Sequence, residues 1–124
     1  AHVVDEGIDP NTAGTQSAKV IQEIIRGEIG FDGCLMSDDI SMKALGGSFE
    51  DRSGKIIEAG CDIVLHCNGD MDEMIAVAKV VPELSGAARR RCETALSGFQ
   101  VPDPEFDRLA AFDEFHTLTG WQGV

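Results

Sequence analysis

The chain has 124 residues and a hydrophobic content of 43%, which suits one ordinary globular domain with an apolar core. Acidic residues outnumber basic ones by 22 to 10, and the formal net charge of −12 gives a surface that repels phosphate backbones and anionic lipid. We therefore expect neither a nucleic-acid partner nor a membrane partner, and no apolar run approaches the length of a membrane span.

The first third of the chain alternates strand-like and helix-like patterns. Residues 1–4 are typical of the end of a strand, and a glycine-containing loop follows them. Isoleucines and a valine recur at helical spacing between residues 20 and 29, so we expect a helix that begins at Ser17 and ends at Gly30. Residues 34–36 are an unbroken apolar run, as in a parallel strand covered on both faces.

The rest of the chain continues this alternation. Its patterns predict a short helical turn at 41–45, a helix at 49–59, a strand at 61–67 and helices at 71–81, 86–96 and 106–115. Strands that alternate with helices in this way predict an α/β fold with a parallel sheet. Three strands are too few to cover so many apolar helix faces. We therefore expect about the last three β/α units of an eight-stranded TIM-type barrel, a fold of about 250 residues.

This architecture sets the expected domain organisation. Residues 1–100 would form the C-terminal part of a β/α-barrel catalytic domain, and residues 101–124 would form a C-terminal tail that packs on the barrel. The chain opens at Ala1, without an initiator methionine and directly in strand-like sequence, so we expect a piece of a longer protein. The remaining N-terminal barrel segment would then be its partner.

Two adjacent carboxylates, Asp38 and Asp39, follow the predicted strand. In β/α folds, ligands and catalytic groups lie at the carboxyl ends of strands. Asp38 could therefore act as a nucleophile, a general base or a metal ligand, or it could be a simple cap or loop residue. Because neighbouring side chains of a strand alternate in direction, Asp39 is expected to point another way and to bond backbone amides or orient Asp38.

Four segments carry a family resemblance. They are Ala-His-Val at 1–3, Ile-Arg-Gly-Glu-Ile-Gly-Phe-Asp-Gly at 25–33, Ser-Asp-Asp-Ile-Ser-Met-Lys-Ala at 37–44 and Ala-Gly-Cys-Asp-Ile-Val-Leu-His-Cys-Asn at 59–68. In this order and spacing they resemble the bacterial family 3 glycoside hydrolases, in particular the β-N-acetylhexosaminidases that recycle peptidoglycan fragments. The resemblance implies a TIM-type barrel without a metal or cofactor, and Asp38 matches the position of its catalytic nucleophile.

The resemblance also implies an activity. A retaining glycosidase attacks the anomeric carbon with an ionised carboxylate and forms a glycosyl-enzyme intermediate. The implied reaction is the release of terminal β-linked N-acetylglucosamine from muropeptides in the cytoplasm. The family's acid/base histidine and its Lys-His sugar-binding motif are expected before Ala1, so the chain alone is expected to be inactive.

Other function classes compete with this hypothesis. One is a broader family 3 hydrolase of the β-glucosidase kind. Another is a metal-dependent barrel lyase or phosphatase that uses Asp38 and Asp39 as ligands. A third is a non-catalytic binding module, which would fold alone with a closed surface.

Two further residues are candidates for substrate binding. His2 lies at the end of the first predicted strand, on the same barrel face as Asp38, although it could equally be a structural histidine bonded to a neighbouring loop. Met42 follows the nucleophile and could line the sugar pocket or simply pack in the core. His66, inside a predicted strand, is interpreted as a core histidine with its hydrogen bonds satisfied.

The remaining polar and thiol side chains have structural interpretations. The four cysteines have no CxxC spacing and mostly apolar neighbours, so we expect reduced, slowly reacting thiols and no zinc site. Residues 89–91 are three consecutive arginines on a predicted helix. We expect them to form a solvated face that pairs with the many acidic side chains.

Overall fold

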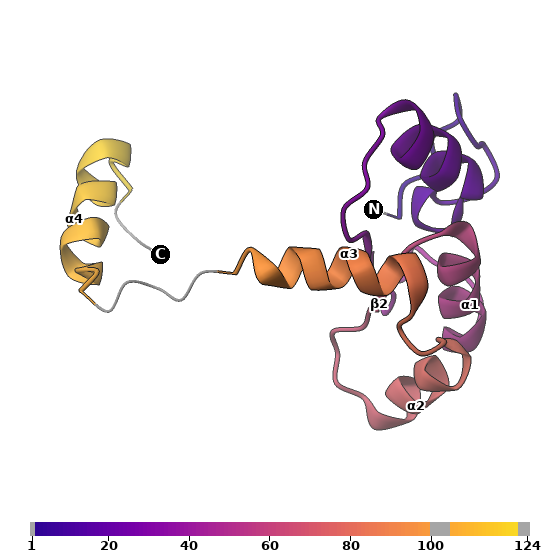
Figure 1. Ribbon diagram of the computed structural model, residues 1–124. Helices are drawn as coiled ribbons and strands as arrows, with labels where there is room; N and C mark the ends of the chain where they lie inside the picture. Colours follow the sequence, from indigo (N-terminus) through magenta and orange to yellow (C-terminus); the bar gives the residue numbers. More distant parts are fainter. Residues whose placement is uncertain (1, 100–104, 122–124) are drawn as a thin grey trace.

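The computed structural model describes residues 2–99 and 105–121. Its elements follow one another as η1 (Gly14–Gln16), η2 (Lys19–Glu28), β1 (Met36–Asp39), α1 (Phe49–Ala59), β2 (Ile63–Leu65), α2 (Met71–Val80), α3 (Gly86–Ser97) and α4 (Arg108–Thr119). The first is a 3-10 turn and the second is a π-helix. The described ranges therefore form an α/β chain in which helices precede, separate and follow two strands (Figure 1).

The strands β1 and β2 pair in parallel, and α1 connects them. Met36 lies opposite Ile63 and Asp39 lies opposite Leu65, so β1 has one more residue than β2 between the two pairs. Such a bulge bends a strand and re-aims its side chains. The predicted parallel sheet is confirmed, and its irregularity falls at the residues that carry the two carboxylates.

Residues 2–4 depart from the predicted first strand. Val4 forms an isolated antiparallel bridge with Ala13, and the Val3 carbonyl accepts a hydrogen bond from the Gly14 N–H at 2.8 Å. This segment is thus paired with the loop that follows it instead of with β1. Ala1 lies outside the described residues. The assignment to the last three units of a barrel stays a prediction.

Both strands differ from their predicted bounds because side chains take the place of backbone partners. The Leu35 N–H donates to the Asp62 carboxylate at 2.8 Å, and β1 begins one residue later. The Cys67 N–H donates to the Asp39 carboxylate at 3.2 Å, beyond the end of β2. The strand predicted at 34–36 is therefore shifted along the chain, and Asp38 and Asp39 lie within β1 instead of after it.

The predicted helices form, with small changes at their ends. Helix α1 has the predicted bounds, since Ser48 and Asp51 form a reciprocal capping box at its start. Gly30, with φ of 71°, follows η2 as predicted. Residues 41–45 form turns instead of the predicted helical turn, and the Met42 N–H bonds the Asp39 carbonyl at 3.2 Å.

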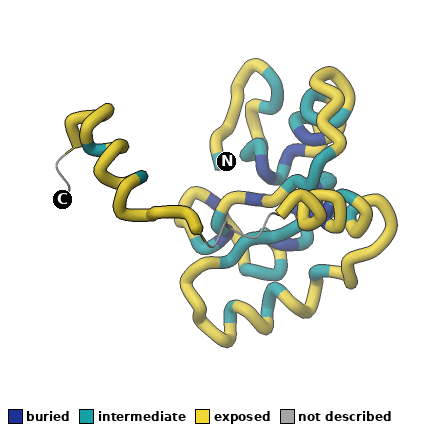
Figure 2. The backbone as a smooth tube through the Cα atoms, turned by 60° about the vertical axis from the view of Figure 1, so that its left-hand side comes forward, coloured by how far each residue is buried: buried dark blue, intermediate teal, exposed yellow. Residues whose placement is uncertain are grey.

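The apolar core lies between η2, α1 and the sheet. Ile21, Ile40 and Ile56 are almost fully buried, and the other members of this cluster are Leu45, Ala59 and Cys61. Figure 2 shows the buried residues gathered in this part of the molecule, while the surrounding loops are exposed. Ile29, predicted on the apolar stripe of η2, is 69% exposed because the stripe extends past the part of the helix that meets the core.

Gly60 joins α1 to β2 at a point that no other residue fits easily. Its φ of 111° is in the left-handed region, and a Cβ atom there would lie 1.8 Å from Gln22 Nε2. That Nε2 atom donates to the Ala59 carbonyl at 3.0 Å, which ties η2 to the end of α1. The glycine thus allows η2 to pack directly against the turn that begins β2.

An ion network centred on Asp62 ties α3 to the sheet. The Asp62 side chain is 3% exposed and accepts hydrogen bonds from Arg26 at 2.8 Å and Arg91 at 3.0 Å. Arg90 and Arg91 also pair with the exposed Asp32. Arg89 pairs with Glu93 within α3. The prediction that the three arginines pair with acidic side chains is thus confirmed, except that Arg91 also reaches a buried carboxylate and is not merely a solvated residue.

All four cysteines are free thiols, as predicted. The Sγ atoms of Cys34 and Cys92 lie 3.1 Å apart, between the start of the sheet and α3. Burial, together with the hydrogen bond to Cys92, raises the pKa of Cys34 to about 11. Burial likewise raises the pKa of Cys61 to about 11. Both thiols therefore stay protonated near neutral pH.

Helix α4 is capped by Asp107, whose carboxylate accepts from the N–H groups of Leu109 and Ala110. Its aromatic side chains gather around Trp121, whose ring centroid lies 5.1 Å from that of His116. In Figure 1 this helix lies apart from the other elements. Packing of a tail at 101–124 on the rest of a barrel stays a prediction, and residues 101–104 and 122–124 lie outside the described residues.

Candidate active site

Asp38 presents the accessible carboxylate of this region. The residue is exposed, and its Oδ1 atom accepts a hydrogen bond from the Asp39 N–H at 2.9 Å. Its position in β1 is at the bulge, close to the end of the strand. A carboxylate held by a backbone amide and open to solvent can act as a nucleophile toward a bound substrate.

Ser37 fixes the backbone on one side of Asp38. Its hydroxyl donates to the Asp38 carbonyl at 2.8 Å and accepts from the Leu65 N–H at 2.9 Å. Ser37 is 5% exposed, so these bonds lie inside the protein. Sequence reasoning named Ser37 only as part of the 37–44 motif and missed this role. The available signal was a small polar residue next to a run of buried apolar ones.

Asp39 fixes the backbone on the other side. Its Oδ1 atom accepts from the N–H groups of Ser41 at 3.0 Å and Cys67 at 3.2 Å, and its Oδ2 atom accepts from the Ser41 hydroxyl. The Ser41 hydroxyl, followed by the Ser41 N–H, lowers the pKa of the Asp39 carboxyl. Asp39 is therefore ionised at neutral pH and acts as an acceptor of hydrogen bonds, not as a general acid.

His2 lies beside the carboxylates and contacts the backbone there. Its Nε2 atom donates to the Asp39 carbonyl at 2.8 Å, and its Nδ1 atom lies 3.1 Å from the Thr15 hydroxyl. Since a carbonyl only accepts, Nε2 carries a proton and a neutral ring accepts from Thr15 at Nδ1. Both nitrogens are engaged, so the geometry favours the structural alternative for His2, which links the first loop to β1.

Met42 is exposed near this edge of the sheet, whereas the side chain of His66 is largely buried. Met42 is 45% exposed, so it does not pack in the core and is open to a ligand. His66 bonds the Glu73 carboxylate at 2.8 Å and meets the Phe49 ring edge-on at 5.5 Å between centroids. Its side chain is 8% exposed. The interpretation of His66 as a histidine with satisfied bonds agrees with these contacts.

Cys67 lies at the same edge, just after β2. Partial desolvation and then the negative charges of Asp39 and Asp38 raise the pKa of its thiol. The hydrogen bond from the Cys67 N–H to the Asp39 carboxylate shows that the ends of β1 and β2 lie close together here, although Cys67 itself is exposed. The sequence pattern predicted that Cys67 lies in a strand that extends to residue 67. In the structure β2 ends at Leu65, so Cys67 lies beyond the strand and is exposed.

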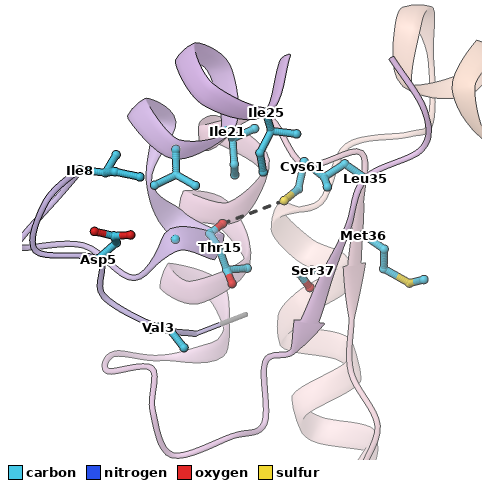
Figure 3. Close-up of a pocket in the computed structure, with 12 residues that line it drawn as sticks. Val3, Asp5, Ile8, Thr15, Ile21, Ile25, Leu35, Met36, Ser37 and Cys61 are labelled. Atoms are coloured by element: carbon cyan, nitrogen blue, oxygen red, sulfur yellow. Dashed lines mark hydrogen bonds between the residues drawn. The ribbon is translucent and has the colours of Figure 1, made fainter. Parts of the chain in front are cut away.

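An apolar cavity lies beside the sheet, and Asp5 and Ser37 are among the residues that line it. It has a volume of about 270 Å³ and lies between η2 and β1 (Figure 3). Ile21, Ile25 and Leu35 line it, and the Cys61 thiol bonds the Thr15 carbonyl across it at 4.0 Å. Asp38 and Asp39 are not part of its lining, and a mostly apolar wall does not suit a sugar. We therefore place the candidate site at the exposed carboxylate edge and not in this cavity.

The carboxylate oxygens of Asp38 and Asp39 are poorly suited to hold a cation between them. The Asp39 oxygens already accept three hydrogen bonds, which leaves little capacity for a metal. Among residues 2–99 and 105–121, no three His, Cys, Asp or Glu side chains gather as ligands would.

Within those same ranges, no helix has the length and apolar character that a membrane span requires.

Comparison with known proteins gives this arrangement a family. Residues 1–96 match the family described as Glycosyl hydrolase family 3 N terminal domain. A beta-hexosaminidase of Shewanella frigidimarina is 39% identical over 99 residues, which are 78% of this chain and 28% of that protein. A beta-hexosaminidase of Alkalilimnicola ehrlichii is 36% identical over 124 residues, which are 98% of this chain and 33% of that protein.

A solved structure extends the similarity to the fold. The beta-N-acetylglucosaminidase of Thermotoga maritima superposes with a TM-score of 0.63 and 28% identity, over 81% of this chain and 24% of that one. The chain thus spans about a third or less of the relatives that it matches. With the match covering residues 1–96 and such identities to named relatives, the chain belongs to glycosyl hydrolase family 3.

Proposed function

We propose that Asp38 is the nucleophile of a retaining glycoside hydrolase that releases terminal β-linked N-acetylglucosamine. The observation that carries the proposal is that the Asp38 carboxylate is exposed and lies between Ser37 and Asp39, two residues of β1 that hydrogen bonds hold in place. Membership of a glycosyl hydrolase family supports it, as do relatives named beta-hexosaminidase. Those names favour a hexosaminidase over the broader β-glucosidase alternative.

The chemistry follows from an exposed carboxylate at the edge of the sheet. An Asp38 oxygen attacks the anomeric carbon while the glycosidic C–O bond breaks, and the leaving oxygen takes a proton from a general acid. Water then attacks the anomeric carbon of the glycosyl ester and gives its proton to the conjugate base of that acid; the ester C–O bond breaks, which restores the Asp38 carboxylate and gives retention of configuration. Asp39 is not that acid because its pKa is lowered. We assign the acid/base to the remaining N-terminal segment of the complete protein.

The finer parts of the proposal concern the substrate and the setting. We assign muropeptides that carry N-acetylglucosamine as substrates, the cytoplasm as the compartment and about the last three β/α units of a TIM-type barrel as the contribution of this chain. Met42, exposed near the carboxylates, would contact the sugar. His2, with both ring nitrogens bonded, would hold the Asp39 carbonyl in place next to the candidate nucleophile.

The test uses the complete protein that carries this chain. Asp38→Ala should lower kcat on an aryl N-acetylglucosaminide by several orders of magnitude and leave the melting temperature close to that of the wild type. Added azide should restore turnover in this variant and give a glycosyl azide, because the small anion fits the space left by the carboxylate. This rescue distinguishes a missing nucleophile from a damaged fold.

Asp32→Ala is the matched control, since Asp32 is an exposed aspartate that lies before β1 and pairs with arginines of α3. It should keep wild-type kcat. Wild-type turnover in Asp38→Ala, or loss of activity without any effect of azide, would contradict the assignment of Asp38.

A further inference from the structure

Asp39 has contacts in three directions at the edge where the candidate nucleophile lies. Its carboxylate accepts hydrogen bonds from Ser41 and from the Cys67 N–H, so it links the turn after β1 to the end of β2. Its carbonyl accepts from His2 Nε2, which links β1 to the first loop. Its N–H donates to the Asp38 carboxylate at 2.9 Å. One residue thus joins three separate segments and also bonds the neighbouring carboxylate.

From these contacts we infer that Asp39 is a positioning residue that orients the Asp38 carboxylate through its own anchored backbone N–H. The inference rests on the proposed function, in which Asp38 is the nucleophile. The Asp39 N–H belongs to the Asp38–Asp39 peptide group, whose carbonyl accepts from the Ser37 hydroxyl. The bonds of the Asp39 side chain and carbonyl restrict the residue on the other side of this N–H. The direction of its N–H, and with it the orientation of the Asp38 carboxylate, is consequently set by the ends of both strands.

The bulge in β1 explains why this position needs an anchor. Met36 pairs with Ile63 and Asp39 pairs with Leu65, so β1 has one extra residue and the regular ladder is interrupted between Met36 and Asp39. Ser37 replaces part of the ladder on one side through the Leu65 N–H. Asp39 replaces it on the other side through the Cys67 N–H.

The expected loss of kcat follows from how precisely a nucleophile must be positioned. A displacement of about 1 Å at a reacting group can lower the rate about 10²-fold. Asp39→Ala in the complete protein removes all three carboxylate bonds. We expect kcat on an aryl N-acetylglucosaminide to fall about 10²-fold with little change in KM, because substrate contacts are not altered.

Asp39→Asn separates positioning from chemistry. The Asn oxygen can still accept from the Ser41 and Cys67 N–H groups, and its amide can donate to the Ser41 hydroxyl. We therefore expect Asn to recover most of the kcat that Ala loses. If Asn and Ala were equally inactive, Asp39 would take part in the chemistry itself, and the inference would be overturned.

Asp107→Ala is the matched control for loss of a carboxylate that accepts two backbone N–H bonds. It should leave both kcat and KM at wild-type values. If Asp39→Ala does not fold, Ser41→Ala tests the same link, because it removes just the hydroxyl bond to Asp39; a several-fold lower kcat at constant KM is expected.

Wild-type kcat in a folded Asp39→Ala protein, or in Ser41→Ala where that variant carries the test, would overturn the inference. The same assay of Asp38→Ala keeps the two proposals apart. Full activity of Asp38→Ala removes the proposed function, whereas an inactive Asp38→Ala beside a fully active Asp39→Ala removes the positioning role alone.

Discussion

Replacing Asp62 with alanine should destabilise the protein by about 3 kcal/mol. This cost is larger than the cost expected for removing an exposed ion pair. The Asp62 carboxylate is 3% exposed and bonds Arg26, Arg91 and the Leu35 N–H. Removing one partner of a buried ion pair costs about 3–5 kcal/mol, and a buried N–H without an acceptor costs about 1–3 kcal/mol.

The lower end of this range applies because both arginines keep other acceptors. Arg26 still donates to the carbonyls of Phe31 and Gly33, each at 2.8 Å, and Arg91 still pairs with Asp32. Their charges are thus not left wholly uncompensated. The Leu35 N–H, in contrast, loses the acceptor that it has in the structure.

Urea denaturation of the complete protein would measure the loss, with hydrogen exchange at the Leu35 amide as the local readout. Asp32→Ala is the control, since Asp32 is 61% exposed and pairs with Arg90 and with Arg91, which also bonds Asp62. We expect Asp62→Ala to lower the urea midpoint clearly and Asp32→Ala to change it little. Equal midpoints for Asp62→Ala and wild type, or a protected Leu35 amide in the variant, would refute the reasoning.

Three other predictions concern a turn, the thiols and pH. Gly60→Ala should cost about 1–3 kcal/mol in urea denaturation, because φ is 111° and the new Cβ meets a neighbouring glutamine, whereas Gly54→Ala inside α1 meets nothing and should stabilise the protein. Cys34 and Cys61, with pKa values of about 11, should react slowly with iodoacetamide at pH 7 until the protein is unfolded; rapid labelling in the native state would contradict this. The lowered pKa of Asp39 stabilises the fold above the unfolded carboxyl pKa of about 3.9, and this stabilisation is lost as pH falls through the lower folded value. Asp39→Asn should therefore have a weaker pH dependence of urea midpoint below pH 4 than wild type; identical dependence would argue against a role for this carboxylate.

Local sequence patterns were sufficient for the bounds of α1 but not for the strand ends. The apolar spacing of α1 and the Ser48 cap are local signals, and the helix has the predicted bounds. The start of β1 depends on the Asp62 carboxylate, which is 27 residues from the Leu35 N–H that it binds. A contact between residues so far apart in the chain leaves no trace in local patterns.

The candidate site shows the same division. Asp38 could be named from the sequence because an acidic pair next to an apolar run is a local feature and because the family resemblance includes it. The supporting roles of Ser37 and His2 depend on partners in β2 and in the loop around Thr15. These roles became visible once the three segments were placed side by side.

The central claim is that Asp38 forms the covalent intermediate, and mass spectrometry of a trapped enzyme tests it most directly. The complete protein would be incubated with a fluorinated N-acetylglucosaminide that slows hydrolysis of the glycosyl ester, then digested and sequenced. The account predicts one added sugar, attached at Asp38 and absent from the Asp38→Ala protein. A sugar attached at Asp39, or no covalent adduct in an enzyme that turns over, would contradict it.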